Sequence, residues 1–173
     1  MHWTMTMDQR KRGWLSPEFH LQFREWLLHS LARYGCVCPV YCVMPDHFHL
    51  LILGWAEPSD QRLATRHLRK TLNAHLKTLG ESFRLQKQAY DHILREEERA
   101  RNAFERVAFY ISENPVRAGL ANFPNEWPFT GCMVPGYPEL TPWQDDYWDR
   151  FWRLYRSKLP DWVWPAINRR LRS

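Results

Sequence analysis

The sequence has no long apolar segment. No window of its 173 residues approaches the roughly 18 uninterrupted apolar residues of a membrane-spanning helix. Residues 1–7 also lack the basic region, apolar run and small-residue cleavage site of a secretory signal. We therefore expect a soluble, cytoplasmic protein with no membrane partner.

Other signatures are also missing. There is no Gly-x-x-x-x-Gly-Lys loop, so no reaction driven by nucleotide hydrolysis is indicated, and there is no internal repeat or low-complexity stretch. The cysteines number only four. Cys36, Cys38 and Cys42 are separated by even numbers of positions, which predicts buried thiols on one strand face, and Cys132 is isolated. A zinc site remains the weaker alternative because this spacing matches no common zinc pattern.

Basic and aromatic residues are both plentiful. Lys and Arg number 24 against 19 Asp and Glu, which gives a net charge of +5, and the chain contains ten Trp, seven Tyr and nine Phe. This excess of positive charge permits a polyanionic partner without requiring one. Most of the rings are expected in the core, although rings beside cations also stack on unpaired bases.

The order of predicted elements indicates an α+β fold. The pattern predicts a strand at 2–7, a helix at 17–34, a hairpin of strands 36–43 and 47–53, a helix at 60–79, one or two strands within 83–94 and a helix at 96–114. This order is that of a ferredoxin-like split βαβ antiparallel sheet with an additional C-terminal helix. Pro39 cannot donate a ladder hydrogen bond, so strand 36–43 is predicted at an edge of the sheet.

The chain divides after residue 131. Residues 1–131 are predicted to form one catalytic domain. Beyond Gly119 several prolines interrupt the pattern, and an aromatic and basic stretch predicts a short helix at about 142–157. We expect residues 132–173 to be a C-terminal extension that packs on the domain and ends in a basic segment able to touch nucleic acid.

The predicted helix 60–79 has one basic face. No acidic residue occurs within 61–80, although solvated helices usually mix both signs of charge. A solvated surface is the alternative, but a face of one sign favours contact with a phosphate backbone. The residues of this face are Arg62, Arg66, Arg69, Lys70 and Lys77.

Two histidines stand at the start of the second hairpin strand. His47 and His49 are two positions apart, so a pleated strand points both imidazoles to the same face. Imidazole nitrogens bind several divalent ions, and two of them leave the rest of the coordination sphere open. A pair of partly exposed or hydrogen-bonded histidines is the alternative. The apolar strand interior that follows favours a metal site, because burying unpartnered imidazoles there is costly.

A polar group gathers near the end of the predicted helix 96–114. Tyr110 borders the apolar stripe of this helix, where a tyrosine is commonly a core residue with its hydroxyl towards solvent. Asn114 follows one turn later and offers a neutral oxygen ligand, and Arg106 lies one turn before. Arg117 stands just beyond the helix end.

The stretches 43–51 (VMPDHFHLL) and 110–120 (YISENPVRAGL) resemble the REP-associated tyrosine transposases, which belong to the single-tyrosine transposases with a His-hydrophobic-His signature. The likeness spans about residues 3–131. It implies that His47 and His49 bind a divalent metal ion, Mg²⁺ or Mn²⁺, that Tyr110 is the nucleophile and that Asn114 is the third metal ligand. It also implies a partner of single-stranded or hairpin DNA, such as repeated extragenic palindromes, contacted by Arg106 and Arg117 as well as by the basic helix.

The resemblance further implies cleavage and joining of DNA through a 5′-phosphotyrosine, in a monomer or a homodimer. Phenol suits such a reversible step, because its pKa near 10 makes its oxygen both a tolerable nucleophile and a tolerable leaving group. Asp46 departs from the family, which usually has asparagine there, and Cys132 stands where serine is common. The negative charge of Asp46 could strengthen cation binding or repel the phosphate.

Two other functions remain open. The same fold could serve as a DNA- or RNA-binding module whose histidines and tyrosine are idle, since the basic helix and stacking aromatics suffice for binding. A metal-dependent phosphohydrolase is the third hypothesis. It is less favoured because it would need more carboxylate ligands than this strand and helix supply.

Overall fold

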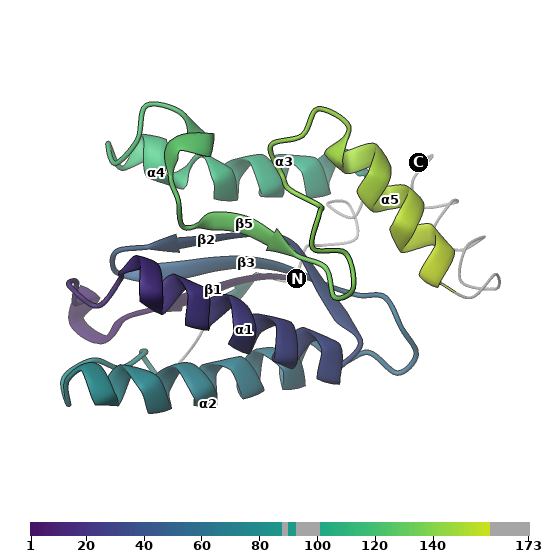
Figure 1. Ribbon diagram of the computed structural model, residues 1–173. Coiled ribbons are helices and arrows are strands. Elements are labelled where there is room, and N and C mark those ends of the chain that lie inside the picture. The colour runs from purple at the N-terminus through teal and green to yellow at the C-terminus, as the bar shows by residue number, and fades with distance from the viewer. Residues whose placement is uncertain (88–89, 93–100, 160–173) are drawn as a thin grey trace.

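The computed structural model describes residues 1–87, 90–92 and 101–159. A five-stranded sheet lies between two layers of helices (Figure 1), and its strand order is β4-β1-β3-β2-β5. All paired strands are antiparallel. The predicted α+β, ferredoxin-like fold is thus confirmed. The strands are β1 (His2–Thr6), β2 (Cys36–Met44), β3 (His47–Gly54), β4 (Tyr90–His92) and β5 (Thr130–Met133).

Helices α1 (Pro17–Arg33) and α2 (Gln61–Leu79) cover one face of the sheet. Both begin at a residue whose side chain accepts a hydrogen bond from a backbone N–H of the first turn: Ser16 from Phe19 in α1, and Asp60 from Leu63 in α2. The apolar sides of both helices form a buried core with alternate residues of the sheet, among them Phe48 and Leu50.

Helix α3 (Arg101–Ser112) covers the opposite face, and the short helix α4 (Asn114–Arg117) follows it directly (Figure 1). Ile111 and Ala108 of α3 pack on Leu51 and on residues of β2. The predicted helix 96–114 therefore ends at Ser112, and its predicted acidic start at residues 96–98 lies outside the described residues. Because α3 lies over β2 and β3, the last turn of α3 faces the start of β3.

Strand β2 is not at an edge of the sheet, so this prediction from Pro39 was wrong. β5 pairs with its outer side. The register of β2 shifts between Val37 and Val40 against β3, and between Cys38 and Tyr41 against β5. A bulge at this point leaves one residue out of the ladder, so an interior strand accommodates a proline that has no N–H to donate.

The bulge also changes the face to which β2 directs its side chains. Cys36 and Cys38 belong to the core under α1 and α2, whereas Cys42 belongs to the core under α3. The prediction that the three thiols share one strand face was therefore wrong. All four cysteines are nonetheless buried and unpaired thiols, as expected for the first three. Burial is the main cause that raises the pKa of Cys42 to about 12.

The segment after residue 131 packs on the sheet through helix α5 (Tyr147–Lys158). Tyr147 and Phe151 are buried in a cluster with Val37 and Leu53. The division of the chain into residues 1–131 and 132–173 stays a prediction, and the predicted basic end lies beyond the described residues. In the part of the chain that the structure describes, none of the helices has the length and apolar character that crossing a membrane requires.

Candidate active site

The two histidines lie where β3 begins, directly after the two-residue turn formed by Pro45 and Asp46. Their neighbours Phe48 and Leu50 face α1 and α2, so His47 and His49 face the side covered by α3. His49 is buried and His47 is half-buried. The strand thus directs both imidazoles to one face, as the sequence predicts.

The two rings converge through one atom each. The Nε2 atoms of His47 and His49 are 3.0 Å apart, and the ring planes are perpendicular. Two nitrogens that bind one ion at about 2.1 Å and at right angles to each other also lie about 3.0 Å apart. The spacing of the two Nε2 atoms therefore fits a divalent cation. Without an ion, a hydrogen bond between these two atoms gives the same spacing.

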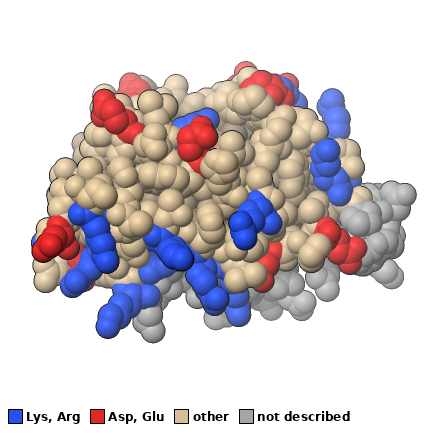
Figure 2. All heavy atoms as spheres, turned by 60° about the horizontal axis from the view of Figure 1, so that its bottom comes forward, with Lys and Arg blue, Asp and Glu red and all other residues tan. Residues whose placement is uncertain are grey.

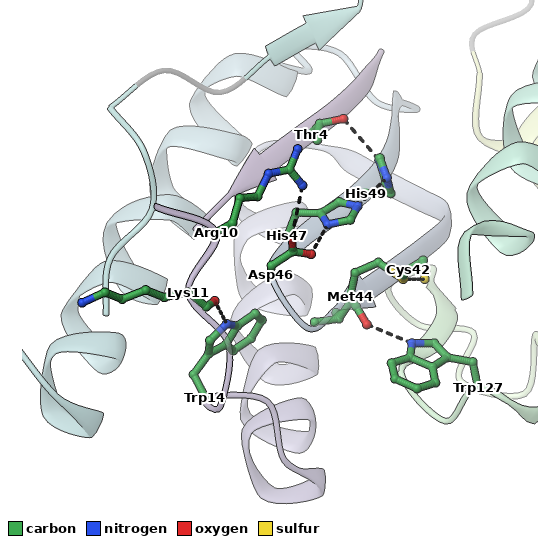
Figure 3. A network of polar contacts seen from close by, with 11 residues as sticks. Thr4, Arg10, Lys11, Trp14, Cys42, Met44, Asp46, His47, His49 and Trp127 are labelled. Atoms are coloured by element: carbon green, nitrogen blue, oxygen red, sulfur yellow. Dashed lines mark hydrogen bonds and ion pairs between the residues drawn. The ribbon is translucent and has the colours of Figure 1, made fainter. Parts of the chain in front are cut away.

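Hydrogen bonds to their Nδ1 atoms hold both rings in place (Figure 3). The Nδ1 atom of His47 lies 2.7 Å from Oδ1 of Asp46, whose other oxygen accepts from Arg10 Nη1 at 3.2 Å. On the second ring, Nδ1 of His49 lies 3.2 Å from Oγ1 of Thr4 and 3.1 Å from Nε2 of His2. The rings are therefore anchored through their Nδ1 atoms, which leaves the Nε2 atoms to face each other.

The surroundings shift the protonation of two of these groups. Burial would raise the pKa of Asp46, but its hydrogen bonds and the charges of His47 and Arg10 outweigh burial and lower it. Burial is the main cause that lowers the pKa of His49 to about 3, and nearby positive charges act in the same direction. Near neutral pH Asp46 is thus a carboxylate and His49 a neutral imidazole, which is the form that binds metal ions.

Tyr110 lies beside the histidines in the same chain. Its ring centroid is 6.0 Å from that of His49 and 6.2 Å from that of His2, in edge-to-face arrangements. The tyrosine is 42% exposed, so its phenol is open to solvent. The helix α3 thus brings the predicted nucleophile against the predicted metal ligands without a second subunit.

Asn114 and Arg117 lie around the same tyrosine. The guanidinium of Arg117 stands 4.7 Å from the centre of the Tyr110 ring. The Nδ2 atom of Asn114 donates to the backbone carbonyls of Tyr110 at 2.7 Å and Ile111 at 3.3 Å, so this side chain closes the end of α3. A cation contact would fall to its amide oxygen, because an amide nitrogen has no lone pair to offer.

Other predicted DNA-contacting residues lie elsewhere. Arg106 lines a surface pocket of about 580 Å³ between α3 and the segment containing Trp143 and Trp148. Helix α2, with its basic residues, is on the opposite face of the sheet from the histidines. Figure 2 shows Lys and Arg side chains gathered on this side of the molecule. On α2 the exposed basic residues are Arg62, Arg66, Lys70 and Lys77.

Arg69 differs from the other basic residues of α2. It is half-buried, and its Nη2 donates to the backbone carbonyls of Gln86 at 2.6 Å and Lys87 at 3.3 Å. These bonds tie α2 to the segment that leads towards β4. Arg69 therefore has a structural task that its place on the helical wheel does not reveal.

Two residues of β1 belong to the site and were missed in the sequence. Thr4 pairs with His49 across the sheet, and His2 lies two residues earlier on the same face. The signal that could have found them is the alternation of polar and apolar residues over residues 2–7. That alternation shows a polar face, but it does not show which strand lies next to it.

The comparisons with known proteins agree with the two motifs. No protein-family model matches the chain. A protein of Haemophilus influenzae, whose provisional name is REP-associated tyrosine transposase, is 26% identical over 151 residues, which cover 80% of this chain and 82% of that protein. A solved structure of a REP-associated tyrosine transposase bound to a REP hairpin superimposes with a TM-score of 0.62. The chain resembles the REP-associated tyrosine transposases in sequence and in fold.

The structural likeness extends over most of both chains. It covers 75% of this chain and 73% of the solved one, at 18% sequence identity. At that identity the superposition concerns the fold alone. The sequence and structural matches together confirm the resemblance to the REP-associated tyrosine transposases that the motifs at residues 43–51 and 110–120 indicate.

Proposed function

We propose that the chain is a metal-dependent DNA strand transferase that cuts and rejoins single-stranded or hairpin DNA through a 5′-phosphotyrosine. The observation that carries the proposal is the meeting of His47, His49 and Tyr110 at one place in one chain. The similarity to REP-associated tyrosine transposases supports it, as does the REP hairpin bound in the solved structure of such a protein.

The histidine pair would hold a Mg²⁺ or Mn²⁺ ion through its Nε2 atoms. When bound, the ion supplies positive charge that polarises a non-bridging phosphate oxygen and positions the phosphorus. The strand β3 and the hydrogen bonds at both Nδ1 atoms keep the rings in place. The amide oxygen of Asn114 is proposed as a further ligand, and water or phosphate oxygens would complete the set.

Tyr110 would attack the phosphorus with its phenol oxygen. The phenol gives up its proton as the new O–P bond forms, the bond from phosphorus to the 3′ oxygen breaks, and that oxygen leaves as a 3′-hydroxyl after taking a proton. A phosphodiester is exchanged for another phosphodiester, so a 3′-hydroxyl of a different end can reverse the step without an external energy source. The cation of Arg117 beside the ring would attract an incoming phosphate.

The test is the trapping of a covalent protein–DNA product. A labelled DNA hairpin with single-stranded flanks is incubated with Mg²⁺ or Mn²⁺, and the product is separated under denaturing conditions. The wild type should give a covalent band that is lost on chelation of the metal, in Tyr110→Phe and in His47→Ala. Tyr137→Phe, which alters a tyrosine in the cluster around α5, is the matched control and should retain the band.

The alternatives give other outcomes in the same experiment. Hairpin binding without a covalent band in the wild type would contradict the transferase and favour an idle DNA- or RNA-binding module. Cleaved DNA that stays free of protein, and that still forms in Tyr110→Phe, would favour a phosphohydrolase in which the tyrosine takes no part.

A further inference from the structure

We propose that Asp46 is a positioning residue that fixes the tautomer of His47, so that the Nε2 lone pair of this ring points to the place where the ion binds. The inference rests on the proposed function for the ion. It concerns a residue that does not itself touch the metal or the DNA. Arg10 takes part as the partner that holds the second oxygen of Asp46.

The hydrogen-bonding capacity of Asp46 and the two imidazoles determines where the protons lie. A carboxylate only accepts hydrogen bonds, so the 2.7 Å contact between Asp46 Oδ1 and His47 Nδ1 requires the proton on Nδ1. In a neutral ring the other nitrogen, Nε2, then carries the lone pair. The 3.0 Å contact between the two Nε2 atoms must in turn be donated by His49. His47 is thus held as the acceptor of the pair.

An ion replaces only one proton in this arrangement. His49 must release the proton on Nε2, and its Nδ1 can carry a proton instead, because Oγ1 of Thr4 lies 3.2 Å away and accepts hydrogen bonds. Both Nε2 atoms then offer lone pairs to the same point. Without Asp46, His47 could carry its proton on Nε2 and would meet the ion with an N–H.

The position of Asp46 is itself fixed. Its side chain is 12% exposed, and its backbone carbonyl accepts from the N–H of Met7 at 2.9 Å. Arg10 reaches it from η1 (Asp8–Arg10), with a side chain that is 63% exposed. Exposed ion pairs contribute little, so the contact with His47 is the stronger constraint on the site.

A plain turn residue would show different behaviour. If Asp46 only stabilised the hairpin turn and paired with Arg10, its removal would lower stability and leave the histidine protons where they are. The tautomer of His47 and the affinity for a divalent ion distinguish the two roles. Neither readout requires DNA or catalytic turnover.

The first measurement is made on the wild-type protein without metal. Nitrogen-15 NMR of the histidine rings, at a pH where His47 is neutral, distinguishes a proton on Nδ1 from one on Nε2. We expect His47 with its proton on Nδ1, and Asp46→Ala with a shift towards the proton on Nε2. A His47 protonated on Nε2 in the wild type would overturn the proposal, whatever the fate of any variant.

The second measurement is the affinity for Mn²⁺, determined by electron paramagnetic resonance on the folded variants. Loss of a partner behind a metal-binding histidine typically weakens metal binding about 10–100-fold, which is the effect expected for Asp46→Ala. Asp46→Asn should lose less, because its amide oxygen still accepts a hydrogen bond from His47. Asp8→Asn is the matched control. It breaks a nearby ion pair, Asp8 with Arg84 at 2.8 Å, and should bind Mn²⁺ within about twofold of the wild type.

The outcomes separate this inference from the proposed function. A wild type that shows the Nδ1 tautomer but binds no Mn²⁺ at His47 and His49 would sink the metal-dependent function while the tautomer assignment stands. Wild-type Mn²⁺ binding that is unchanged in Asp46→Ala would sink the inference and leave the transferase intact.

Discussion

Removing the hydroxyl of Tyr147 should destabilise the fold measurably. This hydroxyl donates to the backbone carbonyl of Pro39, and both groups are buried. Tyr147→Phe keeps the ring packed on Phe151 and Trp148 but leaves that carbonyl without its donor. A buried acceptor left unsatisfied costs about 1–3 kcal/mol in free energy of unfolding.

That free energy corresponds to a visible shift in melting temperature. For a chain of this length, about 1 kcal/mol lowers Tm by roughly 2–4 °C, so a fall of about 2–12 °C is expected. Thermal and urea unfolding followed by circular dichroism measure it, and the urea m-value should stay constant. Tyr155→Phe is the graded comparison. Its hydroxyl bonds to Gly54 at 2.6 Å in a partly exposed place, where water can replace it, so its loss should be smaller.

A Tyr147→Phe protein that melts within about 1 °C of the wild type would contradict this prediction, because the lost hydrogen bond should lower Tm by more than that. The prediction would also be refuted if Tyr155→Phe were the more damaging change. Either result would mean that α5 does not stabilise the bulge of β2 through this hydrogen bond. The aromatic cluster alone would then hold the C-terminal segment in place.

Two further predictions concern a half-buried histidine and the basic helix. Burial, followed by the charge of Arg24, lowers the pKa of His20 to about 4 from its ordinary 6.5. As pH is lowered, the unfolded chain therefore binds a proton at His20 before the folded chain does, and the free energy of unfolding falls between about pH 6.5 and pH 4. Urea unfolding of His20→Gln should show a smaller fall over the same pH range. For Arg66→Ala, the slope of log affinity for hairpin DNA against log salt should become shallower by about 0.9 if this side chain contacts one phosphate, and an unchanged slope would place the DNA elsewhere.

Much of the fold follows from local signals in the sequence. The caps at Ser16 and Asp60 mark the starts of two helices, and the turn after Met44 marks the hairpin. The edge position of strand 36–43 was wrong for a physical reason. A proline has no N–H to donate to the ladder. A bulge within the sheet leaves a residue unpaired and so tolerates the missing donor as well as an edge position does. Nothing local to Pro39 distinguishes the two solutions.

The candidate site divides in the same way. The convergence of His47 and His49 follows from strand periodicity, which is a local property. The contribution of His2 and Thr4 depends on the register of β1 against β3, and that register is set by contacts between residues more than 40 positions apart in the chain. Arg69 shows the converse, because its helical position predicts exposure while carbonyls of a later segment bind it.

The bulge in β2 has a consequence for comparing relatives. Before Pro39 the residues beneath α1 and α2 are Cys36 and Cys38, and after it they are Tyr41 and Val43. The alternation of side chains between the two faces of the sheet therefore shifts by one residue at the proline. An alignment that runs through this strand without a gap would match inward residues with outward ones in any homologue that lacks the extra residue. The two halves of the strand must be aligned separately.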